Sequence, residues 1–176
     1  MPHKQEVTIL WRHTHQHTYQ YGATIQFHPQ GTYFKNQLMP SGLQIHAWTM
    51  TTHFDQEGRT PSLPILKRGH HYRLTFEVSA TPAHSVYFVV TFYRKNDTEI
   101  SQLMINEAQK DFEYPKEAYR YDIRMMNTAC HHLMFRRIVL TELETHHENS
   151  TALNPYENIQ QVNQIIQATR HPSRTF

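Results

Sequence analysis

The chain has 176 residues, the length of one ordinary domain, with 18% charged residues and a formal net charge of +2. No block of Lys and Arg accompanies this small charge, so nucleic acid is excluded as the main expected partner. The single cysteine, Cys130, excludes an internal disulfide and any multi-cysteine zinc or iron–sulfur site.

Two further features bear on the compartment in which the protein works. The N-terminal residues lack the apolar run of a signal peptide, and the longest apolar run, residues 86–90, is far shorter than the roughly 20 residues of a membrane helix. A lone cysteine also fits a reducing compartment. We therefore expect a cytoplasmic protein without a membrane span.

Apolar and polar side chains alternate along most of the chain, the pattern of strands that bury one face. In chain order, the alternating segments are residues 7–11, 19–27, 43–52, 72–78, 100–105, 119–125 and 133–143. Residues 86–93 are apolar on both faces, which predicts a strand covered on both sides. Turn-forming residues separate the segments at 28–31, 67–69, 80–84 and 94–98. The pattern predicts eight or nine strands in an all-β fold, an antiparallel β-sandwich or jelly roll, over residues 1–143.

The composition changes after residue 143. Residues 144–153 are polar and predict a linker, residues 154–170 predict an amphipathic helix, and residues 171–176 form a tail. Asn154 and Pro155 have the chemistry of an N-cap and a first helical position. One apolar stripe follows at helical spacing, made by Tyr156, Ile159, Val162 and Ile166.

No catalytic signature is present: the chain has no G-x-S-x-G elbow, phosphate-binding glycine loop, H-E-x-x-H or dinucleotide fingerprint. Cys130 precedes His131, but neighbours on an extended strand face opposite ways, so we expect a buried, inert thiol. The carboxylates Asp111, Glu113 and Glu117 are interpreted as a solvated loop. We therefore expect no enzyme activity and no cofactor.

Histidine is unusually frequent, with 15 residues. If the segment is extended, His13, His15 and His17 share one face of a strand, a spacing that can bind zinc or copper. The other histidines are scattered over predicted turns and linkers, which is typical of biased composition. We expect no specific metal site.

The aromatic residues allow two interpretations. Rings on a sheet can form a platform for sugars, or they can fill the core of a sandwich. The residues concerned are Trp11, Tyr19, Tyr21, Trp48, Tyr87 and Tyr93. Trp48 follows His46 by two residues, so both side chains are expected on one face of their strand.

Several segments resemble a known family. They are residues 21–27 (YGATIQF), 36–42 (NQLMPSG), 45–48 (IHAW), 61–69 (PSLPILKRG), 112–115 (FEYP), 118–119 and 135–140. Together they resemble the third accessory secretory proteins of Gram-positive accessory Sec systems, over roughly residues 7–143. The helix predicted beyond residue 143 lies outside this resemblance.

The resemblance implies a β-sandwich similar to carbohydrate-binding modules, without catalytic activity. It implies work in the cytoplasm, at the inner face of the membrane through partners. Those partners are two other accessory secretory proteins, one glycosyltransferase-like and one serine-hydrolase-like, and an accessory SecA ATPase; the exported substrate is a serine-rich repeat adhesin. The expected function is a non-catalytic adaptor, and the alternative is a lectin-like module that binds sugars of the adhesin directly.

The segment from Met39 to Trp48 is the candidate partner-binding site. Met39, Leu43 and Trp48 supply apolar bulk. Ser41 and His46 supply directional hydrogen bonds, and such a mixture is found at interface centres. The alternative is that Met39 and Trp48 close the sandwich core. The predicted helix adds a second candidate surface, made by Tyr156, Ile159 and Ile166.

Overall fold

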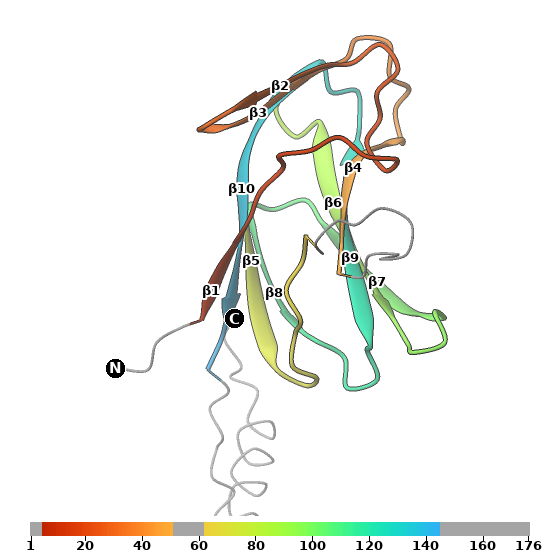
Figure 1. Cartoon of the computed structure of the whole chain (residues 1–176), viewed down its shortest axis with the longest axis vertical. Helices are drawn as coiled ribbons and strands as arrows, with labels where there is room; N and C mark the ends of the chain where they lie inside the picture. Colours follow the sequence, from red (N-terminus) through yellow and green to blue (C-terminus); the bar gives the residue numbers. More distant parts are fainter. Residues whose placement is uncertain (1–4, 51–61, 145–176) are drawn as a thin grey trace, which may run out of the picture. The chain divides into compact units, whose positions relative to one another are not determined.

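The computed structural model describes residues 5–50 and 62–144, which contain ten strands and no helix (Figure 1). The strands are β1 (Glu6–Ile9), β2 (Thr24–His28), β3 (Gly31–Lys35), β4 (Gln44–Thr49), β5 (His71–Thr81), β6 (Val86–Tyr93), β7 (Glu99–Ile105), β8 (Gln109–Glu113), β9 (Arg120–Asn127) and β10 (His132–Glu142). The predicted linker and helix lie outside the described residues.

The strands form two antiparallel sheets, which confirms the predicted β-sandwich class. One sheet has the order β2-β3-β10-β5-β8, and the other has the order β4-β9-β6-β7. Strand β10 is the centre of the first sheet, since it pairs with β5 over ten residues. Along its other edge, β3 pairs with the beginning of β10 and β1 with its end, on either side of a register shift between Phe135 and Arg137.

Alternate side chains of both sheets fill the space between them. Phe88, Val90 and Phe92 of β6 point inward and are at most 5% exposed. Phe76 of β5 stacks on Phe88 across the two sheets, with ring centroids 4.1 Å apart. On the other side of β6, Thr91 is buried, but Tyr87, Val89 and Tyr93 are only half-buried. The prediction of a strand covered on both sides therefore holds only in part for this face.

Strands β3 and β8 were not predicted. In β3, Gly31 follows a tight turn, and a Cβ added there would lie 2.4 Å from the carbonyl oxygen of Phe135, so the close approach of β10 requires glycine. Strand β8 is too polar for an alternation pattern and contains two of the carboxylates assigned to a loop. It is an edge strand, and the guanidinium of Arg73 on β5 bonds both oxygens of Asp111, at 2.7 and 2.9 Å.

Residues 10–23 form a long connection in place of the extended segments expected there. The backbone turns at residues 15–18, where Thr18 N donates to His15 O at 2.8 Å and His15 N donates to Thr18 Oγ1 at 3.2 Å. This turn corrects the strand face expected for His13, His15 and His17, since none of them lies in a strand.

His46 fastens this connection to the core. Its side chain is only 3% exposed, and its Nδ1 lies 2.6 Å from Thr18 Oγ1. The imidazole stacks on Trp11, with centroids 4.7 Å apart, and meets Trp48 edge-on at 4.7 Å, which confirms that His46 and Trp48 share a face. Burial, reinforced by His15, His17 and His13, lowers the pKa of His46 to about 2.

We expect His46 to make the fold sensitive to mild acid. Unfolding returns the imidazole to an ordinary pKa of about 6.5. Below that pH the unfolded chain binds a proton on His46, whereas the folded chain leaves the imidazole neutral. Stability is therefore lost as pH falls below about 6.5, by roughly 1.4 kcal/mol between pH 7.5 and 5.5 from this residue alone. Urea unfolding of the wild type and of His46→Gln at both pH values measures the difference. Equal pH dependence in the two proteins would contradict this assignment.

Candidate partner-binding site

The connection between β3 and β4, residues 36–43, carries part of the sequence pattern singled out above and is held by two buried asparagines. Asn36 is 1% exposed and forms hydrogen bonds through both its backbone and its side chain. Its N donates to His131 O at 3.1 Å, its Nδ2 donates to Tyr21 O at 2.8 Å, and its Oδ1 accepts from Leu38 N at 3.0 Å. Asn36 thus joins the loop to two other connections of the chain.

Asn127, at the end of β9, holds the other half of the loop and is also 1% exposed. Its Nδ2 donates to Pro40 O at 3.1 Å, and its Oδ1 accepts from Cys130 N at 2.7 Å. Its backbone accepts from Gly42 N at 2.7 Å and donates to Leu43 O at 2.9 Å. Gly42 has φ +88°, a conformation that an L side chain rarely adopts. The loop backbone is therefore fixed on β9.

This fixed loop exposes apolar side chains. Leu38 is 71% exposed and Leu43 is 40% exposed. Tyr21, 77% exposed, precedes Gly22, where an added Cβ would lie 3.5 Å from Leu38 Cδ1, so Tyr21 and Leu38 belong to adjoining segments. We call these three residues the apolar loop patch. They account for three of the seven large hydrophobic side chains that the described residues expose, and grouped exposure of this kind is typical of contact surfaces.

The structure places the predicted site residues at two depths. Met39, His46 and Trp48 are buried, at 8%, 3% and 1% exposure, while Ser41 is exposed. Trp48 packs on Phe135 with centroids 5.1 Å apart, and its Nε1 donates to Leu10 O at 3.0 Å. The three buried side chains thus belong to the core in the isolated chain, as in the alternative interpretation. A role in partner binding remains a prediction for all four, and Tyr156, Ile159 and Ile166 lie outside the described residues.

Sequence reasoning missed Leu38, Asn36 and Asn127. Leu38 lies in a bend where Gln37 is also exposed, so no alternation pattern marked its exposure. No sequence signal distinguishes Asn36 and Asn127 from ordinary turn asparagines, because their bonds join segments as far as 88 residues apart.

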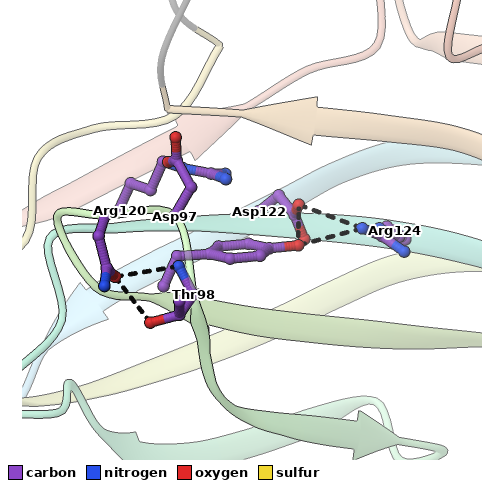
Figure 2. Close-up of polar contacts among 7 residues, drawn as sticks. Asp97, Thr98, Arg120, Asp122 and Arg124 are labelled. Atoms are coloured by element: carbon purple, nitrogen blue, oxygen red, sulfur yellow. Dashed lines mark hydrogen bonds and ion pairs between the residues drawn. The ribbon is translucent and has the colours of Figure 1, made fainter.

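A second candidate surface lies on the outer face of the sheet β4-β9-β6-β7. Asp122 of β9 is 7% exposed; the hydroxyl of Tyr93 donates to its Oδ2 at 3.1 Å, and Arg124 Nη2 lies 3.5 Å from the same oxygen (Figure 2). Burial and then Asp122 raise the pKa of Tyr93. Arg120 lies over the Tyr93 ring, 3.8 Å from its centroid, and bonds Asp97 at 2.8 Å.

Two buried atoms of this face, Asp122 Oδ1 and Thr91 Oγ1, have no hydrogen-bond partner among residues 5–50 and 62–144. Thr91 and Asp122 are directly opposite on β6 and β9, so the two atoms belong to adjoining positions of one face. A buried polar atom without a partner costs about 1–3 kcal/mol, which a bound donor can recover. Tyr87 and Tyr93 lie on the same side of β6, both half-buried.

Other candidate chemistry has a structural explanation. Cys130 is buried, its Sγ lies 3.3 Å from His132 O, and burial raises the pKa of the thiol, which confirms the expected buried thiol. Glu117 pairs with Arg94 at 3.2 Å. Within residues 5–50 and 62–144, no three His, Cys, Asp or Glu side chains are placed to hold a metal ion.

No helix within these ranges is long and apolar enough to cross a membrane.

Curated relatives support the resemblance drawn from the sequence. The chain is 46% identical over 135 residues to the accessory Sec system protein ASP3 of Staphylococcus aureus (strain NCTC 8325 / PS 47), a match that spans 77% of this chain and 42% of that protein. It is 35% identical over 127 residues to the protein of the same name from Streptococcus gordonii, spanning 72% of this chain and 80% of that protein. The chain thus spans less than half the length of the S. aureus relative.

Solved structures share the fold. A chain in the crystal structure of accessory secretory proteins 1, 2 and 3 in Streptococcus pneumoniae matches with a TM-score of 0.74 and 25% identity, over 78% of this chain and 96% of that one. A chain of the Glycosylation Associate Protein (Gap123) complex from Streptococcus agalactiae matches with a TM-score of 0.73 and 26% identity, over 82% of this chain and 49% of that one.

The family model described as "Accessory Sec secretory system ASP3" matches residues 18–142, from the turn that contacts His46 to the end of β10. That range includes the apolar loop patch, both asparagines that hold it and the polar face around Asp122. With this match and the two curated relatives, the chain belongs to the accessory Sec secretory system ASP3 family.

Proposed function

We propose that this chain is a non-catalytic adaptor that assembles with the other accessory secretory proteins through the apolar loop patch, Tyr21, Leu38 and Leu43. The observation that carries the proposal is the exposure of Leu38 and Leu43 on a loop whose backbone is fixed by Asn36 and Asn127. Tyr21 is exposed on the adjoining connection, where its carbonyl accepts a hydrogen bond from Asn36. Relatives of this chain occur in the solved complexes of S. pneumoniae and S. agalactiae, which supports assembly as the family's mode of action.

A fixed loop favours binding because ordering flexible side chains and loops on association costs free energy. Here the hydrogen bonds of Asn127 order the loop before any partner arrives. Apolar side chains at the centre of an interface can each contribute 2 kcal/mol or more, while the surrounding contacts contribute little. In this proposal, Met39 anchors the loop in the core, and Ser41 adds a polar contact at its surface. His46 and Trp48 hold the connection that carries Tyr21, through Thr18 and Leu10.

The wider role follows from the family resemblance. The partners are the glycosyltransferase-like and serine-hydrolase-like accessory secretory proteins, which together with an accessory SecA ATPase modify and export a serine-rich repeat adhesin. The chain would work in the cytoplasm, at the inner face of the membrane through these partners. A further contact surface is the predicted helical stripe of Tyr156, Ile159 and Ile166.

The double change Tyr21→Ser and Leu38→Ser tests the adaptor. Because both side chains are exposed, the melting temperature should change little. Association with the two other accessory secretory proteins should weaken by 2 kcal/mol or more, about thirtyfold, in calorimetric titration.

Two controls accompany this test. Met104→Ser changes a side chain of similar exposure, 62%, on β7 and should bind as the wild type does. Trp48→Ala should lower the free energy of unfolding by about 3–5 kcal/mol, since it empties a buried site.

Wild-type affinity in the double variant would refute the loop as the interface, and failure of the wild type to bind any accessory component would refute the adaptor.

The unpartnered Asp122 Oδ1 and Thr91 Oγ1 favour one alternative, a lectin-like module. Sugar hydroxyls can donate to the carboxylate while the rings of Tyr87 and Tyr93 supply apolar surface. In that case the wild type should bind a glycosylated serine-rich repeat fragment without any partner and ignore the unglycosylated fragment. Asp122→Asn should weaken the binding at least tenfold while complex formation persists. Equal binding of both fragments would exclude sugar recognition.

A further inference from the structure

Three connections meet at the end of the sandwich opposite the apolar loop patch, where β5 and β9 begin and β6 ends (Figure 1). They are residues 62–70, 94–98 and 114–119. Gly69 N donates to Tyr114 O at 2.8 Å, which joins the first to the third. Tyr119 N donates to Tyr93 O at 2.7 Å, which places the third beside the start of the second. The three connections therefore form one continuous surface.

This surface is more positive than the chain as a whole. The three connections contain five Lys or Arg residues and two Asp or Glu residues, a surplus of three positive charges, whereas the complete chain has a net charge of +2. Two of the five cations are paired: Lys67 lies 3.8 Å from Glu142, and Arg94 lies 3.2 Å from Glu117.

The other three cations, Arg68, Lys95 and Lys116, have no ion pair with any described residue. Two of them flank an exposed aromatic ring. Tyr119 is 47% exposed, with Arg68 Cζ 5.8 Å and Lys95 Nζ 6.0 Å from its ring centroid. Lys116 lies against Gly69, the residue after Arg68, at 3.4 Å from the position of an added Cβ.

An exposed aliphatic side chain completes the surface. Ile65 is 86% exposed, the highest value among the large hydrophobic residues that the structure describes. It lies three residues before Arg68, between Leu63 and Leu66, which are 4% and 7% exposed and anchor the segment in the core. The hydroxyl of Tyr121 donates to Pro64 O at 2.8 Å and fixes the backbone beside Ile65. Ile65 therefore points outward from a well-held backbone.

We propose that Ile65, Arg68, Lys95, Lys116 and Tyr119 bind the surface of a membrane that contains anionic lipids. Unpaired cations are attracted to anionic headgroups, and tyrosine rings and aliphatic side chains favour the boundary between headgroups and acyl chains. An acidic protein segment would pair with the cations but would leave Ile65 without an apolar partner. The contact is independent of the adaptor interface, which lies at the other end of β9.

Vesicle co-sedimentation of the full chain tests the proposal. The wild type should bind vesicles of phosphatidylcholine with phosphatidylglycerol, ignore vesicles of phosphatidylcholine alone, and dissociate as salt is raised. Each cation near the surface changes the affinity roughly fivefold, so Arg68→Gln with Lys95→Gln should weaken binding about twenty-fivefold. Tyr119→Ala with Ile65→Ser should also weaken binding, at unchanged net charge.

The matched control is Lys35→Gln with Arg136→Gln, which removes two exposed charges from other parts of the sandwich and should retain wild-type binding. Four results would overturn the proposal. They are no binding of the wild type to the anionic vesicles, an equal loss of affinity in the Arg68 and Lys95 variant and in the control variant, no loss of affinity in the Arg68 and Lys95 variant, or binding to poly-glutamate in place of vesicles. The last result would assign the surface to an acidic polypeptide. None of these results bears on the apolar loop patch.

Discussion

The ten-residue pairing of β10 with β5 is the constraint on which the rest of the sandwich depends. The opposite edge of β10 is divided at the register shift after Phe135, so that β3 occupies one half and β1 the other. Strand β1 leads into Trp11, whose carbonyl accepts a hydrogen bond from Thr32 of β3. Strand β3 leads into Asn36 and the loop that carries the apolar patch. One bulged strand therefore positions both the connection that contacts His46 and the loop that exposes Leu38 and Leu43.

Alternation in the sequence predicted the strands that bury one apolar face, because burial of every second side chain leaves a period of two. The strands it missed depend on contacts that are distant in sequence. Strand β8 is held by Arg73 of β5, and β3 by the close approach of Gly31 to β10. The same limit applies to the site. The spacing predicted that His46 and Trp48 share a face of their strand, but it did not predict that this face is the inner one. Their exposed fractions of 3% and 1% show that both side chains are buried.

The aromatic residues illustrate how burial decides between interpretations that composition leaves open. Trp11 and Trp48 are 2% and 1% exposed and both contact the ring of His46 in the core, so neither belongs to a surface platform. Tyr21 and Tyr119, by contrast, are 77% and 47% exposed and lie near opposite ends of the sandwich. A phenol ring is tolerated at the surface because its hydroxyl forms hydrogen bonds with water there.

Strand β9 connects those two ends. It begins directly after Tyr119 and ends at Asn127, and at about 3.3 Å per residue its eight residues span roughly 26 Å. It is hydrogen-bonded to β4 on one side and to β6 on the other, so it has no free edge along which to slide or stretch. A partner bound at one end of this strand is therefore held at a constant separation from a surface bound at the other end. If one of them tilts, the sandwich rotates with it as a rigid body, and the other end rotates too.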